Sequence, residues 1–159
     1  MIRSTDVFLD TSTFSAHFTV KYRERLENGL LFLRDETGDR TILKEWKSAR
    51  TLLARYKALA VPFLGSPAEF GKVWIEVLPG GAGTSWTIEE DDYAQAHIRT
   101  RVCLVPTPGA WSFSGLERVI LGVGLVNVIE HRTLCSEINL SEYPRTHLVV
   151  DVVRPNVDN

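Results

Sequence analysis

Alternation of hydrophobic and polar residues dominates the first 43 positions. Residues 14–22 carry Phe, Ala, Phe, Val and Tyr at every second position, which is the period of a strand with one buried face. Shorter apolar runs at 7–9, 30–34 and 40–43 predict further strands, and Asn28-Gly29 is a strong turn signal because both residues tolerate positive φ. We therefore expect residues 1–43 to form an antiparallel β-meander.

The period changes after residue 42. Apolar residues then recur at spacings of three and four, which places them on one stripe of a helix that Pro62 ends. That stripe consists of Ile42, Trp46, Ala49, Leu53, Tyr56 and Ala60. A second helix is predicted over 115–131, where Ser114 and Glu117 fit a capping box. A strand pair is the alternative there, because the segment is rich in β-branched residues and contains Gly122 and Gly124.

The rest of the chain favours strands. Residues 72–78, 96–105 and 148–153 are the main candidates, 84–88 is a weaker one, and the glycine-rich residues 79–83 form a hairpin tip. The predicted fold class is α+β: an antiparallel sheet with two helices packed on it and an N-terminal β-meander. We expect a single domain over 1–159, with the meander at 1–43, an α+β core at 44–155 and a polar tail at 156–159.

Composition is that of an ordinary soluble globular protein. The 159 residues are 44% hydrophobic and 24% charged, and the formal net charge of −2 does not indicate a nucleic-acid or membrane partner. Cys103 and Cys135 have apolar neighbours and predict two buried thiols instead of a disulfide framework. No long apolar run follows Met1, so we expect an intracellular protein that is not secreted through a signal peptide.

Motifs for catalysis are weak. His17, His97, His131 and His147 are widely separated and none has a partner at ligand spacing, so we predict no metal and no cofactor. The segment 80–85 lacks the lysine of a phosphate-binding loop, and no serine lies in a nucleophile elbow. The sequence thus leans against an enzyme.

Carboxylates offer one catalytic alternative. An apolar strand at 7–9 ends in Asp10-Thr11-Ser12, and this opening resembles that of PIN-domain nucleases, which place an aspartate there to hold a divalent metal. Metal-assisted phosphodiester cleavage needs several acids around the cation. The resemblance implies a catalytic set of Asp10, Glu45, Asp92 and Glu137.

Charge is strongly segregated along the chain. Five cations and the single acid Glu45 give the predicted first helix a net charge of +4, and four consecutive acids follow the hairpin tip. These subunit-interface candidates are Lys44, Lys47, Arg50, Arg55, Lys57, Glu89, Glu90, Asp91 and Asp92. Opposite charges on separate elements could join copies of the chain, which predicts a homo-oligomer, in a ring where the rotation closes. Nucleic-acid binding beside Trp46 and Tyr56 stays open, although both aromatics lie on the apolar stripe.

The order of predicted elements over 42–155 resembles the tail-terminator and neck proteins of tailed bacteriophages. The shared plan is a helix, a strand, a long hairpin arm, a strand, a helix and a closing strand. This resemblance implies a ring-forming structural protein of the virion that joins tail to head, with other structural proteins as partners. A small-molecule binding module is a third possibility, for which the sequence names no site.

Overall fold

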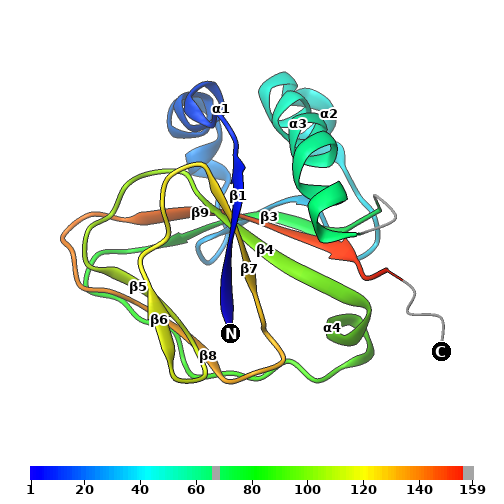
Figure 1. The fold of residues 1–159 in the computed structure, drawn as a ribbon. Helices are drawn as coiled ribbons and strands as arrows, with labels where there is room; N and C mark the ends of the chain where they lie inside the picture. The colour runs from blue at the N-terminus through cyan, green and yellow to red at the C-terminus, as the bar shows by residue number, and fades with distance from the viewer. Residues whose placement is uncertain (66–68, 156–159) are drawn as a thin grey trace.

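The computed structural model describes residues 1–65 and 69–155, which form two antiparallel sheets and a layer of helices (Figure 1). The larger sheet has six strands in the order β1 (Ile2–Phe8), β7 (Leu125–Ile129), β4 (His97–Cys103), β9 (Arg145–Val153), β3 (Phe70–Leu78) and β2 (Leu30–Arg34). The smaller sheet has three, in the order β6 (Glu117–Val119), β5 (Ala110–Ser114) and β8 (Cys135–Asn139). The predicted mixture of helices and antiparallel sheet is confirmed.

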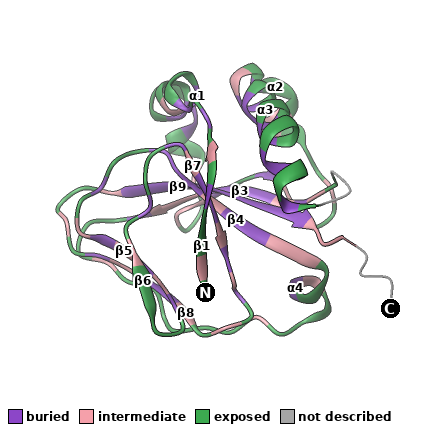
Figure 2. Ribbon diagram, viewed as in Figure 1, coloured by how far each residue is buried: buried purple, intermediate pink, exposed green. Residues whose placement is uncertain are grey.

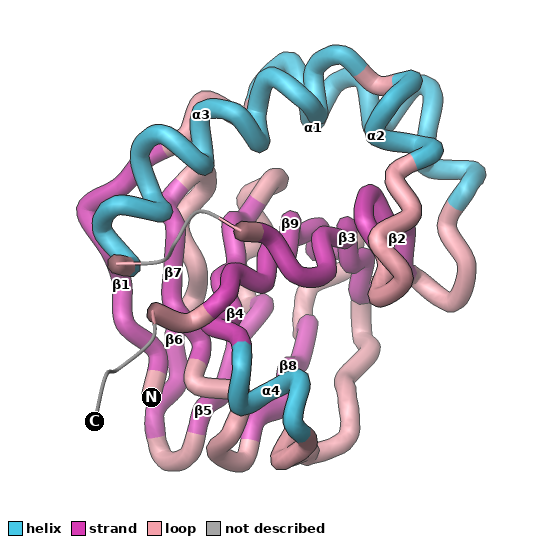
Figure 3. Tube along the Cα trace, turned by 90° about the vertical axis from the view of Figure 1, so that its right-hand side faces the viewer, coloured by secondary structure: helices cyan, strands magenta, loops and turns pink. Residues whose placement is uncertain are grey.

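Helices cover one face of the larger sheet, and the smaller sheet faces the other (Figures 1 and 3). The covering helices are α1 (Ser12–His17) with its continuation through Phe18–Tyr22 and Arg23–Arg25, α2 (Thr41–Glu45) and α3 (Lys47–Leu64). A short helix, α4 (Asp92–Ala96), precedes β4. No described helix is long and apolar enough to cross a bilayer.

Side-chain alternation gives the larger sheet two different faces. The helix face is apolar: Val73 and Ile75 of β3, Val102 of β4, and Leu148 and Val150 of β9 belong to the hydrophobic core. Burial of that core drives the packing of the helices on the sheet (Figure 2). The opposite face carries the intervening positions, which are mostly polar or charged: Lys72, Trp74, Glu76, His97, Arg99, Arg101, Arg145, His147 and Asp151. The space between the two sheets is therefore polar.

The predicted N-terminal meander is wrong over residues 14–22 and 40–43. Phe14, Phe18 and Tyr22 satisfy a spacing of four as well as a spacing of two, and the chain follows the helical spacing. All three rings are buried and stack on the Trp46 ring, whereas Val20 of the same alternating run is 88% exposed. Strand β2 and the Asn28-Gly29 turn, with φ of 51° and 77°, form as predicted, but residues 41–45 are helical.

The predicted first helix exists, with different ends. Trp46 adopts an extended conformation that separates α2 from α3, and Pro62 lies inside α3 instead of ending it. The helix ends one turn later at Gly65, whose φ of 66° is the left-handed conformation of a helix C-terminus. Apart from Ile42, which is half-buried, every residue of the predicted stripe is buried.

The predicted helix over 115–131 is wrong, because the segment forms strands β6 and β7. Gly115, with φ of 59°, makes the β5–β6 turn in place of a helix cap. Strand β7 pairs with β1 and β4, so its valines are buried between strands and helices. The strands predicted at 72–78, 96–105 and 148–153 form as β3, β4 and β9, whereas 84–88 contacts β8 through isolated bridges near Gly83 and Thr87. The predicted tail at 156–159 lies outside the described residues.

Candidate functional site

A cavity of about 510 Å³ opens between the two sheets. Its walls come from β2, β3, β4 and β8, from residues 84–91, and from the end of β7 through His131. Charged side chains of both signs line it: Lys72, Arg99, Arg101, Glu76, Glu89, Asp91 and Glu137. This volume is within the usual range of small-molecule sites, so the cavity is the candidate functional site.

Two arginines and two glutamates form a network at the inner end of this cavity. The Glu137 carboxylate of β8 pairs with both Arg101 of β4 and Arg145 of β9, and it accepts a hydrogen bond from the Ser112 hydroxyl at 3.2 Å. Glu76 of β3 pairs with the same two arginines. The network ties the two sheets together, and because Arg145 and Glu137 are almost fully buried, removal of one charge leaves another without compensation.

A second ion pair lies closer to the N-terminal end of β4. The Arg99 Nε and Nη2 donate to the two carboxylate oxygens of Asp151, at 2.9 and 3.0 Å, and its Nη1 donates to Glu89 at 2.5 Å. Burial favours the neutral guanidine, but the bonds to Asp151 and Glu89 outweigh it and raise the pKa of Arg99. The guanidinium also stacks over the Trp74 ring, 4.9 Å from its centroid. Arg99 is thus fully committed to partners within the chain.

His131 is a residue of the cavity wall whose two ring nitrogens have no hydrogen-bond partner among the described residues. The residue is 3% exposed. Burial and the nearby Arg99 charge lower its pKa, so the ring is neutral at pH 7. A neutral imidazole offers one donor and one acceptor. A buried polar group of this kind lowers the stability of the fold unless another group or a ligand forms hydrogen bonds with it.

His147 of β9 lies on the polar face of the larger sheet but does not line the cavity, and its Nδ1 has no hydrogen-bond partner among the described residues. Its side chain is fully buried, and burial together with the Arg101 charge lowers its pKa to about 3. The unfolded chain binds a proton near pH 6.5 and the folded chain does not. His147 therefore leaves the free energy of unfolding unchanged above pH 6.5 and lowers it progressively as the pH falls from 6.5 toward 3.

The pH dependence of stability tests this assignment. Between pH 7 and pH 4 we expect the free energy of unfolding to fall by about 3 kcal/mol on account of His147. The variant His147→Gln cannot take up this proton, so its stability should depend less steeply on pH. Urea unfolding of both proteins across that range measures the difference. Parallel curves for the two proteins would contradict the buried neutral histidine.

The four carboxylates predicted for a nuclease do not meet. Asp10 follows β1 on the helix side of the molecule, and Glu45 ends α2 and pairs with Arg25. Asp92 begins α4, and Glu137 lies between the sheets in the arginine network. Within residues 1–65 and 69–155 no group of three His, Cys, Asp or Glu side chains could hold a metal ion. The nuclease hypothesis is wrong.

The cations predicted for a subunit interface and the acidic segment 89–92 have different surroundings in the structure. None of the five predicted cations pairs with a carboxylate among the described residues, and Arg50 instead donates to the carbonyls of Leu43 and Lys44. In the acidic segment, Glu89 pairs with Arg99 and Asp91 caps α4, whereas Glu90 and Asp92 are exposed. Two of these acids are therefore used inside the chain, and a docking role for the rest stays a prediction.

The two cysteines, Cys103 and Cys135, differ in their surroundings. Both are free thiols, and burial raises the pKa of Cys103 to about 11, which disfavours the reactive thiolate. Cys135, predicted to be buried, is half-buried and lines the cavity.

Comparison with known proteins identifies the fold. No family model matches the chain, and no curated protein matches it. A solved prolyl-4-hydroxylase from Pseudomonas putida is 15% identical, with a TM-score of 0.60 over 98% of this chain and 93% of that one. The viral collagen prolyl hydroxylase of Paramecium Bursaria Chlorella virus-1 is 12% identical, with a TM-score of 0.61 over 97% and 90%. An oxidoreductase of the 2OG-Fe(II) oxygenase family from Burkholderia pseudomallei is 14% identical, with a TM-score of 0.57 over 80% and 68%.

The chain shares its fold with these oxygenases. The resemblance to phage tail-terminator and neck proteins is therefore wrong, and the predicted virion role is wrong with it. The error arose because the resemblance rested on the order of elements, and two of those elements, the helix over 115–131 and the regular hairpin arm, do not form. At 12–15% identity, the structural likeness shows the fold alone, and the activity has to be argued from the residues of the site.

The residues of the cavity do not fit an iron centre. Non-haem Fe(II) oxygenases hold the metal with two histidines and one carboxylate on one face. Here His131 is the one histidine among the cavity residues, and the inner carboxylates Glu76 and Glu137 are engaged by arginines.

Sequence reasoning missed most of this site. The sequence predicts no role for the isolated histidine His131, and no motif marks Arg99, Arg101 or Arg145 as site residues. The alternation at 97–102 held the available signal, because it places arginines on the face opposite Ile98, Thr100 and Val102. A polar face of that kind is ordinarily exposed to solvent, and only the second sheet shows that it is buried.

Proposed function

We propose that the chain is a metal-independent binding protein that holds a small, neutral, polar molecule in the cavity between its sheets. The observation that carries the proposal is His131, a buried neutral ring with an unused donor and an unused acceptor at the wall of that cavity. Natural proteins leave few such groups unsatisfied, and a binding site is a physical reason to keep one.

Charge compensation supports a neutral ligand. Arg99, Arg101 and Lys72 line the cavity, and each already has a carboxylate partner within the chain. An anionic ligand such as 2-oxoglutarate that bound Arg99 or Arg101 would have to displace a buried or half-buried carboxylate and leave it without its cation. Lys72 differs, because its partner Glu36 is exposed and can be released into water. A neutral molecule that exchanges hydrogen bonds with His131 disturbs none of these pairs.

A ligand screen followed by NMR of the imidazole tests the proposal. We expect neutral amides, ureas or polyols to shift the His131 ring resonances in a saturable way, and His131→Leu to weaken binding of the best compound about tenfold or more. The matched control is His17→Leu, which changes an exposed histidine on the helical layer. His131→Gln restores one donor and one acceptor and should recover part of the affinity.

The same preparation separates this function from that of the oxygenases. 2-Oxoglutarate with Mn²⁺ should leave the melting temperature of the protein unchanged. A saturable, metal-dependent rise in that temperature, or the absence of any neutral compound that reaches His131, would contradict the proposal.

A further inference from the structure

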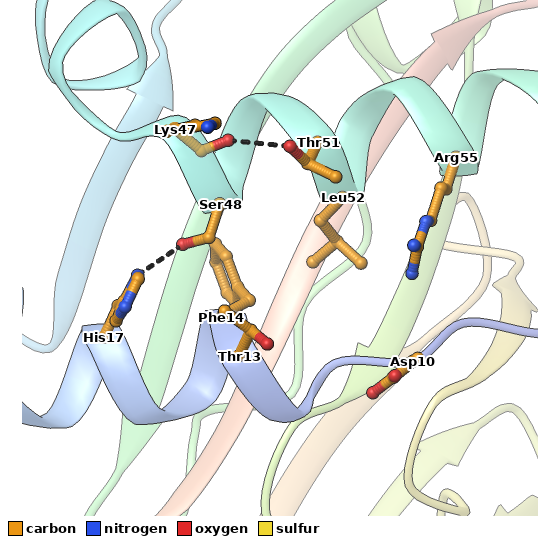
Figure 4. Close-up of a pocket in the computed structure, with 9 residues that line it drawn as sticks. All are labelled: Asp10, Thr13, Phe14, His17, Lys47, Ser48, Thr51, Leu52 and Arg55. Carbon is orange, nitrogen blue, oxygen red and sulfur yellow. Dashed lines mark hydrogen bonds between the residues drawn. The ribbon is translucent and has the colours of Figure 1, made fainter.

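A second hollow lies on the helical layer, between α1 and α3. It has a volume of about 230 Å³ (Figure 4). Phe14 of α1 and Leu52 of α3 are buried and form its apolar floor. Lys47 and His17 stand at one end of the groove, and Arg55 and Asp10 stand at the other. The groove therefore combines an apolar base with a charged rim.

The rim carries two cations, Lys47 and Arg55, against one acid, Asp10, whose pKa is lowered by its hydrogen bonds from Ser12 and then by the Arg55 charge. Arg50 and Lys57 of α3 line a different hollow. Helix α3 contains Lys47, Arg50, Arg55 and Lys57 and no acidic residue, and none of these cations forms an ion pair with a described carboxylate. Asp10 is the acid of the groove, and its carboxylate accepts hydrogen bonds from the Ser12 amide and hydroxyl at 3.1 and 2.6 Å. An acidic partner would meet a complementary surface here.

Exposed apolar side chains continue the groove along α3. Lys47, Thr51, Arg55, Leu59 and Phe63 follow one another at intervals of four, so each is the neighbour of the next on the helix surface. Because four residues turn the helix about 40° beyond one full turn, this stripe winds about 160° around α3 from Lys47 to Phe63. Leu59 is 52% exposed and Phe63 is 49% exposed. Large apolar side chains beside a charged groove are typical of a surface that binds another protein.

The neighbouring strand β1 adds to the same surface. The Arg3 guanidinium lies 5.8 Å from the centre of the Phe63 ring. The far end of the stripe is thus also cationic beside an exposed aromatic ring.

We propose that the groove and this stripe of α3 bind an acidic, amphipathic peptide segment of a partner protein. Acidic side chains of the segment would pair with Lys47 and Arg55, and its apolar side chains would cover Leu59, Phe63 and the floor at Phe14. A nucleic acid fits less well, because it offers phosphates to the rim but nothing that covers exposed aliphatic and aromatic side chains, and because the chain has a formal net charge of −2. This surface lies on the other face of the large sheet from the cavity and does not depend on the proposed ligand (Figure 1).

Fluorescence anisotropy with a designed peptide tests the proposal. The probe is a fluorescein-labelled helix-forming peptide with glutamates on one face and leucine and phenylalanine on the other, and the comparison probe has every glutamate replaced by lysine. We expect saturable binding of the acidic probe only, weaker at high salt. The double variant Lys47→Glu with Arg55→Glu should weaken it about tenfold or more. Leu59→Ser with Phe63→Ser should also weaken it, which distinguishes a protein surface from a purely electrostatic one.

The matched control is Arg118→Glu with Arg132→Glu, which makes the same change of net charge away from the helices. This control should bind the acidic probe like the unchanged protein, and amide NMR should place the shifts at α1 and α3. Absence of saturable binding, equal binding of the two probes, or equal binding by the Lys47→Glu, Arg55→Glu variant would overturn the proposal. Displacement of the peptide by a DNA duplex of equal or higher affinity would overturn it in favour of a nucleic-acid surface.

Discussion

Replacement of Glu137 by glutamine should lower the free energy of unfolding by about 3–5 kcal/mol, which is the usual cost of breaking a buried ion pair from one side. The carboxylate of Glu137 compensates Arg101 and Arg145 together, and Arg145 is 2% exposed. Glutamine keeps the size of the side chain but removes its charge, so two buried guanidinium groups would share Glu76 alone. Urea unfolding at pH 7 measures the loss.

The control for this experiment is Glu130→Gln. Glu130 forms a comparable pair with Arg132, at 3.0 Å, but both side chains are partly exposed to water. Exposed pairs contribute about 1 kcal/mol or less, so this variant should stay close to the unchanged protein. Equal losses in the two variants would show that burial of the Glu137 network does not govern its energetics.

Truncation of Trp46 to alanine is expected to cost about 3–5 kcal/mol, as for other large aromatic side chains in cores. The indole stacks on Phe14 and Tyr22, with centroids 4.5 and 4.0 Å away, and its Nε1 donates to the Ser48 hydroxyl at 2.6 Å. These contacts join the N-terminal helical segment to α3, so their loss should release that segment from the sheet. Thermal unfolding measures the stability, and hydrogen exchange at residues 12–22 locates the opening.

Trp86→Ala is the matched comparison for Trp46→Ala. Trp86 is 52% exposed and contacts the Phe113 ring at 5.6 Å between centroids. Because most of its surface already faces water, we expect a cost of about 1 kcal/mol or less. If hydrogen exchange at 12–22 stayed unchanged in the Trp46 variant, the indole would not be the link between α1 and α3.

Local patterns correctly predicted the elements whose apolar residues fit only one spacing, either that of a strand or that of a helix. The run Val73, Ile75 and Val77 fits only a strand, and the stripe through Ala49, Leu53 and Tyr56 fits only a helix, and both are correct. Phe14, Phe18 and Tyr22 fit both periods, and the decision comes from Trp46, a contact distant in sequence. Residues 115–131 failed for a related reason, since valines buried between strands and helices look like a buried helix from the sequence alone.

The candidate site was harder to predict than the fold, because its partners come from different strands. Arg101 lies on β4, Glu137 on β8 and Glu76 on β3, and no spacing within the sequence relates them. The unpartnered ring of His131 is likewise a property of the assembled interior, since the sequence shows only an isolated histidine. The net charge gives no sign of the arginine and glutamate network either, because acids and bases nearly cancel over the whole chain.

The position of β9 has a consequence for synthesis of the protein. This strand follows all its neighbours in the chain, yet it lies in the middle of the large sheet and pairs with both β3 and β4. While the nascent polypeptide leaves the ribosome, those two strands present open edges that nothing can satisfy until residues 145–153 emerge. Folding is therefore completed after translation of this segment, and a transcript cut short before codon 145 yields a product prone to aggregation.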